Sequence, residues 1–159
     1  MDFHLTLAGD GPERPQIVKL VREYNLTPRV ELPGFLPHGR IARLLQQAHV
    51  FIMPSLIAPS GDRDGIPTVI LEALLQEVPV VATEVSGIPE VVIPGDTGWL
   101  TPPEDPQALA RDMLAALSDP TEARRRGQAG GALVAREFDS RTNYARLQAL
   151  IEGATRPAP

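Results

Sequence analysis

The sequence predicts an α/β fold, in which a parallel β-sheet carries helices on both faces. Five short apolar runs recur along the chain, and each is followed by a glycine or proline signal. Between the first four runs, apolar residues three or four positions apart show the period of an amphipathic helix. Strands that alternate with such helices pair in parallel, because each helix carries the chain back to the starting edge of the sheet.

The apolar runs predict five strands, at residues 4–8, 29–32, 50–54, 79–83 and 98–100. Helical spacing predicts three intervening helices, at residues 13–24, 39–48 and 68–77. The first of these helices has one apolar stripe, formed by Ile17, Leu20, Val21 and Tyr24.

Beyond residue 103 the pattern is helical. Asp105 is placed to cap a helix that begins with Pro106. Two more helices are expected at 121–137 and 140–151, and the three glycines in the first of them weaken its prediction. We interpret the arginine run Arg124–Arg126 as a solvated face rather than a phosphate patch.

Composition excludes several classes of protein. The 159 residues are 43% apolar and 22% charged, which is typical of one globular domain over 1–159 and not of a disordered chain. No run approaches the ~20 apolar residues of a membrane span, and the N-terminus lacks a signal peptide, so we expect a cytoplasmic protein. The net charge of −5 disfavours nucleic acid as a partner.

Metal and cysteine chemistry are not expected either. The absence of cysteine excludes disulfides, thiolate metal sites and a cysteine nucleophile. His4, His38 and His49 are scattered along the sequence, so no metal site is predicted. Lys19 is the only lysine beside 14 arginines, and it is therefore the one candidate for any chemistry that needs a lysine.

The long segment 54–67 is the first candidate binding site. It leaves the carboxyl end of a predicted strand, where sheets of this kind bind ligands. Pro67 suits the first helical position, and the free N–H groups after it would favour a phosphate; these belong to Thr68, Val69 and Ile70. Gly65 allows the backbone to approach a ligand closely.

Glu72 is the only charge in an otherwise apolar helical segment. One interpretation is a narrow wet stripe that it shares with Thr68 and Gln76, four positions away on either side. The other is that Asp64 and Glu72 flank one ligand and bind sugar hydroxyls, since a carboxylate accepts several hydrogen bonds.

Two further loops lie at the same predicted edge. Gly9 and Gly11, after the first strand, either shape a ligand-binding turn or form only a tight turn. Phe35 and Leu36, after the second strand, either present an apolar wall to a nucleobase or belong to the core.

These residues resemble a known family, the group 4 retaining glycosyltransferases of GT-B architecture, through their C-terminal donor-binding domain. The resemblance runs through AGDGPER, LPGFLP, FIMPS, the block DGIPTVILEALLQEVPVVATEVSGIPEVV and GDTGWLTPPEDPQALA, which together are most of the chain. It implies a Rossmann-like sheet as the C-terminal half of a GT-B fold. The segment PSLIAPSGDRDGIP is similar to transferases that build exopolysaccharide repeat units.

The resemblance also implies roles for individual residues. Glu72 would bind the nucleotide ribose, and Asp64 would contact hydroxyls of the donor sugar. Phe35 and Leu36 would meet the base. The remaining donor contacts would come from Gly9, Gly11, Ser55, Gly65, Ile66, Pro67, Thr68 and Val69.

The chain departs from the family pattern at several points. Asp64 replaces the commoner glutamate, and Pro67 replaces a common glycine. Glu77 replaces the usual glycine at a helix end, so we expect the turn after this helix to be made differently. The family's first strand with its G-R-x-x-x-x-K stretch and its N-terminal acceptor domain are not in this sequence, so the chain is interpreted as a fragment that is inactive alone.

The resemblance implies that the full-length protein transfers a hexose from a nucleoside-diphosphate sugar, with a UDP-sugar favoured, to a glycan or lipid-linked acceptor. No cofactor is expected, and the full-length protein would lie in the cytoplasm or at the inner face of the membrane. The alternative is a non-catalytic domain that binds a nucleotide or partner. A phosphoacceptor receiver domain is disfavoured, because the acidic cluster and late lysine that it needs are not in the sequence.

Overall fold

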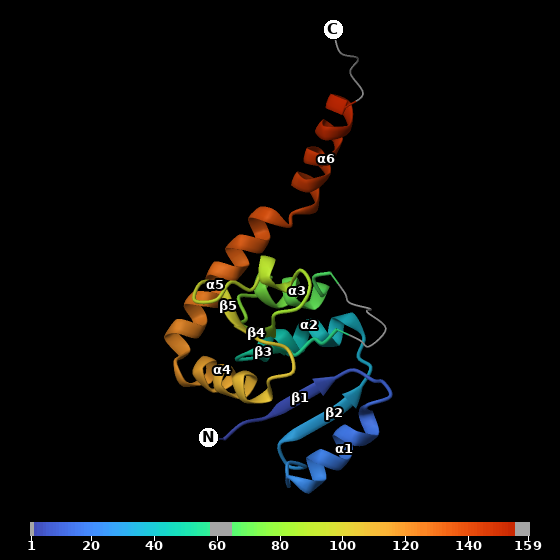
Figure 1. Cartoon of the computed structure of the whole chain (residues 1–159), viewed down its shortest axis with the longest axis vertical. Coiled ribbons are helices and arrows are strands. Elements are labelled where there is room, and N and C mark those ends of the chain that lie inside the picture. Colours follow the sequence, from blue (N-terminus) through green and yellow to red (C-terminus); the bar gives the residue numbers. More distant parts are fainter. Residues whose placement is uncertain (1, 58–64, 155–159) are drawn as a thin grey trace. The chain divides into compact units, whose positions relative to one another are not determined.

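The computed structural model describes residues 2–57 and 65–154. Its strands are β1 (Leu5–Ala8), β2 (Val30–Gly34), β3 (Phe51–Met53), β4 (Val80–Thr83) and β5 (Gly98–Thr101). Its helices are α1 (Arg14–Glu23), α2 (His38–Gln47), α3 (Thr68–Leu75), α4 (Pro106–Ser118), α5 (Pro120–Glu137) and α6 (Ser140–Ala154), with a 3₁₀ turn η1 (Ile88–Glu90) (Figure 1). Every predicted strand and helix is confirmed, with small differences at the ends.

The chain forms two compact units, Met1–Leu44 and Leu45–Pro159. In the first unit, β1 and β2 pair in parallel, with Leu5 opposite Val30 and Ala8 opposite Gly34. Helix α1 connects them in sequence, as the alternating pattern predicts.

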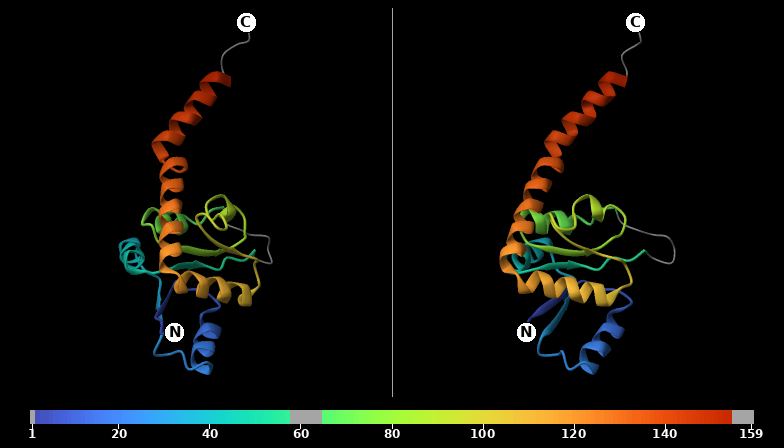
Figure 2. Two further views of the ribbon diagram at one scale, coloured as in Figure 1. Left: turned by 90° about the vertical axis from the view of Figure 1, so that its left-hand side faces the viewer. Right: turned by 60° about the vertical axis from the view of Figure 1, so that its left-hand side comes forward.

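In the second unit, the sheet has the order β3-β4-β5 and is parallel throughout. Every residue of the central strand β4 is buried, which explains why this strand reads as a continuous apolar run rather than an alternating one. Helices α3 and α4 cover opposite faces of this sheet (Figure 2). The predicted parallel sheet with helices on both faces is therefore confirmed here, while β1 and β2 form a separate parallel pair.

The helix caps follow from local sequence. The Asp105 side chain accepts a hydrogen bond from the Ala108 N–H at 2.8 Å, which confirms the predicted cap of α4. Asp119 caps α5 in the same way, through the N–H groups of Thr121 and Glu122. A carboxylate at this position satisfies helix donors that would otherwise lack an acceptor.

The glycines of α5 lie where this helix packs against the end of α3. A Cβ added at Gly127 would lie 2.1 Å from the Glu77 carbonyl oxygen, and one at Gly130 would lie 2.4 Å from a methyl carbon of Leu74. One at Gly131 would lie 2.8 Å from the Leu74 carbonyl oxygen. These glycines therefore permit close packing of the two helices, although by helix propensity alone they weaken α5.

Glu77 makes the turn from α3 into β4 in the left-handed conformation, with φ of 58°. The expectation that this turn must be made differently from a glycine turn is wrong, because Glu77 adopts the backbone conformation that glycine adopts most easily.

The interpretation of Arg124–Arg126 as a solvated face is wrong for Arg126. This half-buried side chain lies over the ring of Trp99, and it donates hydrogen bonds to the Gly98 carbonyl oxygen and to Glu122, both at 2.8 Å. Arg126 thus joins α5 to β5, a contact between positions far apart in sequence.

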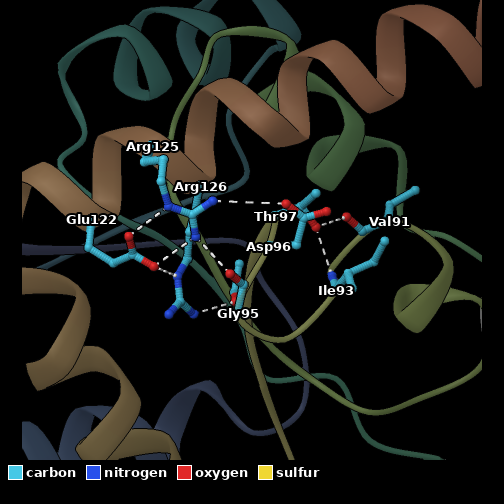
Figure 3. A network of polar contacts seen from close by, with 9 residues as sticks. Val91, Ile93, Gly95, Asp96, Thr97, Glu122, Arg125 and Arg126 are labelled. Atoms are coloured by element: carbon cyan, nitrogen blue, oxygen red, sulfur yellow. Dashed lines mark hydrogen bonds and ion pairs between the residues drawn. The ribbon is translucent and has the colours of Figure 1, made fainter.

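The loop before β5 is held by the same part of α5. Arg125 donates to the Gly95 carbonyl oxygen at 2.7 Å, and Thr97 Oγ1 bridges the Ile93 N–H and the Val91 carbonyl oxygen (Figure 3). The buried Thr97 hydroxyl therefore has both a donor and an acceptor as partners.

Helix α6 differs from the other helices of the second unit, because its side chains from Ser140 to Glu152 are all exposed. Asp139 begins it, accepting hydrogen bonds from the Thr142 N–H and hydroxyl. No helix in residues 2–57 and 65–154 is both long and apolar enough to cross a membrane.

Candidate functional site

A small cavity of about 110 Å³ lies in the second unit, where β3 and β4 end. It is lined by Ser55, Leu56, Gly65, Pro67, Val85 and Ile88. Three of these residues, Ser55, Gly65 and Pro67, are predicted site residues, and the structure brings them together although ten positions separate the first two.

The start of α3 lies beside this cavity, since Pro67 both lines the cavity and precedes the helix. Pro67 is the N-cap rather than the first helical residue, with φ of −57° and ψ of 123°. The N–H groups of Thr68 and Val69 have no acceptor among the described residues. Two backbone donors at a helix N-terminus form a favourable environment for an anion.

The expectation of three free N–H groups is corrected at Ile70, whose N–H donates to the Pro67 carbonyl oxygen at 2.9 Å. The first turn of α3 closes as a tight i to i+3 turn, which uses this donor.

Glu72 lies one turn into α3 and is half-buried. The wet-stripe interpretation fits Thr68, which is exposed, but it does not fit Gln76. The Gln76 side-chain oxygen is buried and has no hydrogen-bond partner in the described part of the chain. The polar residues of α3 therefore differ in environment, and a uniform solvated stripe does not describe them.

Asp64, the other predicted carboxylate, lies outside the described residues. Its predicted pairing with Glu72 around one ligand accordingly remains a prediction.

Two cavity residues, Val85 and Ile88, were not predicted as site residues. Both are buried and follow the end of β4. They could have been found from the rule that ligands bind at the carboxyl ends of parallel strands, because they come directly after a predicted strand.

Ile66 packs against Gly87, the residue before η1. A Cβ at Gly87 would lie 2.8 Å from Ile66 Cγ1 and 3.5 Å from the carbonyl carbon of Gly65. Gly65 and Ile66, which precede α3, are thus in contact with the turn after β4.

The first unit brings together two other predicted loops. The Gly9 N–H donates to the Gly34 carbonyl oxygen at 2.9 Å, so the loop after β1 lies against the end of β2. Gly9 has φ of 137°, which strongly favours glycine, and the Gly11 N–H donates to the Asp10 carboxylate. Gly9 thus has a conformational role in this loop, and the choice between a ligand-binding turn and a merely tight turn stays open.

Phe35 and Leu36 follow β2 and have different environments. The Phe35 side chain is 83% exposed, whereas Leu36 is half-buried. The core interpretation is wrong for Phe35, because its side chain is exposed. An exposed aromatic ring leaves its face open for stacking.

In the part of the chain that the structure describes, no group of three or more His, Asp or Glu side chains is placed to hold a metal ion. His4 lies 3.6 Å from Glu31 in the first unit, and both side chains are largely exposed.

Comparison with known proteins identifies relatives over nearly the whole chain. The family profile described as "Glycosyl transferases group 1" matches residues 1–132. The amylovoran biosynthesis glycosyltransferase of Erwinia amylovora is 36% identical over 150 residues, which are 94% of this chain and 37% of that protein. A colanic acid biosynthesis glycosyltransferase of Salmonella typhimurium is 42% identical over 108 residues, 68% of this chain and 27% of that protein.

A solved structure supports the same relationship. HepE of Anabaena, in complex with UDP and glucose, is 26% identical to this chain and superposes with a TM-score of 0.80. The match covers 94% of this chain and 40% of HepE. The chain thus spans about a quarter to two fifths of the length of these three relatives.

Proposed function

This chain belongs to the group 1 glycosyl transferases, and from that premise we propose that it is the donor-binding half of a retaining glycosyltransferase. The full-length protein would transfer a hexose from a nucleoside-diphosphate sugar to a hydroxyl of a glycan or lipid-linked acceptor. The observation that carries the proposal is the cavity at the ends of β3 and β4, which Ser55, Gly65 and Pro67 line beside the start of α3.

The diphosphate would lie at the start of α3. The N–H groups of Thr68 and Val69 would donate to its oxygens, and the helix dipole would favour its charge. Since negative charge builds up on the leaving diphosphate as the sugar departs, donors fixed in this position would stabilise the transition state more than the bound substrate.

The ribose would bind Glu72, whose carboxylate can accept hydrogen bonds from the two ribose hydroxyls. Asp64 would contact hydroxyls of the donor sugar, and Ile66 would support the backbone there. The base contacts expected of Phe35 and Leu36, and the donor contacts expected of Gly9 and Gly11, belong to the first unit and stay predictions. Binding of UDP and glucose by HepE supports a uridine nucleotide as the donor.

The relatives named for amylovoran and colanic acid biosynthesis support a place in exopolysaccharide assembly. The acceptor would then be a growing repeat unit, and the protein would lie in the cytoplasm, including the inner face of the membrane where lipid-linked acceptors are held. The acceptor domain would be supplied by a partner segment outside this sequence.

The test is a titration of the purified chain with UDP, GDP and ADP at millimolar concentrations. Binding is monitored through the chemical shifts of the backbone amides. Saturable shifts at residues 65–72 with UDP, and weaker ones with GDP and ADP, are expected. A folded sample without saturable shifts for any nucleotide would contradict the proposal. Sugar transfer by the chain alone would contradict the further expectation that catalysis needs the acceptor domain.

A further inference from the structure

Thr83, the last residue of β4, holds the loop that leaves β3. Its side chain is nearly fully buried, with 4% of the residue exposed, and its hydroxyl donates to the Ser55 carbonyl oxygen at 2.6 Å. The bond lies just beyond the last paired residues of the two strands, Met53 and Ala82.

The backbone pairing of β3 with β4 ends at Met53 and Ala82, so a link beyond this point comes from a side chain. The Thr83 hydroxyl supplies a link between the strands one residue later. Ser55 and Leu56, which line the cavity, are thereby tied to the most buried strand of the unit.

Another part of the cavity lining, Gly65, is in contact with the turn that follows β4. Gly65 lines the cavity, and the added-Cβ distances show that this residue and Ile66 lie directly against Gly87. Because a side chain at Gly87 would push Ile66 away, the absence of one allows this wall to approach.

We propose that Thr83 is a positioning residue of the donor site. Its hydroxyl fixes the position of Ser55 and Leu56 at the cavity, while Gly87 leaves room for Ile66 beside it and so for Gly65 at the cavity. The proposal rests on the proposed donor-binding function, but the contact between Thr83 and Ser55 exists without a ligand and is testable without one.

The experiment compares Thr83→Val, which keeps the shape and removes the hydroxyl, with Thr83→Ser, which keeps the hydroxyl. The matched control is Thr101→Val. Thr101 is also buried and donates to the Ala82 carbonyl oxygen at 3.3 Å, but it does not line the cavity. Two quantities are measured on the 159-residue chain: the backbone amide shifts and order parameters of residues 55–57 without ligand, and the Kd for UDP.

In Thr83→Val we expect shifted amides and lower order parameters at residues 55–57. The Kd for UDP should rise about tenfold, because binding must then supply the loop ordering that the lost hydrogen bond within the protein provided. Thr83→Ser should restore both quantities. Thr101→Val should lower the melting temperature without changing either of them.

Two results would overturn the proposal: unchanged amides and order parameters at residues 55–57 in Thr83→Val, or equal weakening of UDP binding in Thr83→Val and Thr101→Val. If the unsubstituted chain does not bind UDP, the donor-binding function fails, and with it the role of Thr83 in a donor site. The amide data would then still show whether Thr83 holds the loop.

Discussion

The guanidinium carbon of Arg126 lies 4.0 Å from the centroid of the Trp99 ring. Trp99 belongs to β5 and is 8% exposed. The guanidinium stacked on its ring therefore packs α5 against this edge strand of the sheet. The same guanidinium donates to Gly98 and Glu122, and this fixes its plane over the ring. One side chain therefore combines a cation–π contact with hydrogen bonds to a strand and to its own helix.

Arg126→Lys is expected to destabilise the protein, because an ammonium group cannot stack and form both hydrogen bonds at once. The free energy of unfolding should fall by about 1–3 kcal/mol, measured by urea denaturation followed by tryptophan fluorescence. Arg124→Lys, an exposed position on the same helix, is the control and should change stability by less than about 0.5 kcal/mol. Equal effects of the two substitutions would contradict the role given to Arg126.

Glu122 makes the stability of this region depend on pH. Hydrogen bonds from Arg125 and Arg126 lower the pKa of its carboxyl from 4.5 to about 2. Because the pKa is lower in the folded state, the ion pairs stabilise the fold fully above about pH 4.5, and their contribution is lost as the pH falls toward 2. The stability difference between the unsubstituted chain and Glu122→Gln should thus be constant at neutral pH and shrink over that range. A difference that stays constant down to pH 2 would exclude the ion pairs as its cause.

Glu77→Gly should stabilise the protein by about 0.5–1 kcal/mol. Glu77 has φ of 58°, a conformation that is strained for residues with a Cβ and free for glycine. Thermal unfolding of the variant checks this. Glu84→Gly is the comparison, because Glu84 is also exposed but lies outside the left-handed region, and glycine there should not raise the melting temperature.

Gly127→Ala should destabilise the protein, since the new Cβ would lie 2.1 Å from the Glu77 carbonyl oxygen and force α5 away from α3. Overpacking of this kind costs about 1–3 kcal/mol. Gly39→Ala in α2 places the same methyl group where no atom lies within 4 Å, and it should leave stability unchanged or slightly raised. If both substitutions stabilise the chain, helix propensity rather than packing governs position 127.

Glu72→Gln should raise the Kd for UDP at least tenfold, because the carboxylate is proposed to accept hydrogen bonds from the ribose, and bonds to charged groups contribute about 1.5–3 kcal/mol. Calorimetric titration measures the affinity, and circular dichroism checks that the chain remains folded. Glu77→Gln removes an exposed carboxylate at the end of the same helix and should leave the Kd unchanged. Unchanged affinity in Glu72→Gln would remove the ribose role.

Much of the secondary structure was predictable, because apolar periodicity and capping act over a few neighbouring residues. Asp105 illustrates this, since its cap depends only on the three residues that follow it. The contact between Arg126 and Trp99 was not predictable in the same way. It joins residues 27 positions apart, and a charged run on an amphipathic helix has the same local pattern whether or not an aromatic ring lies beneath it.

The candidate site was predictable on the side formed by segment 54–67, where proline and glycine mark the helix start. Its other side was missed, because Val85 and Ile88 are ordinary core types, and their place after a predicted strand was the one signal for them. Phe35 is an apolar residue that is exposed rather than buried. Its exposure depends on packing that its neighbours in sequence do not determine.

The contact between α5 and the end of α3 also has an entropic consequence. Where Gly127 meets Glu77, the approaching atoms on both sides are backbone atoms. No rotamer is immobilised there when the helices dock, so this part of the interface forms without the loss of side-chain freedom that usually opposes packing. At Gly127 the spacing of the two segments is therefore set by van der Waals contact between backbone atoms, and it should change little with temperature as side-chain motions elsewhere in the protein increase.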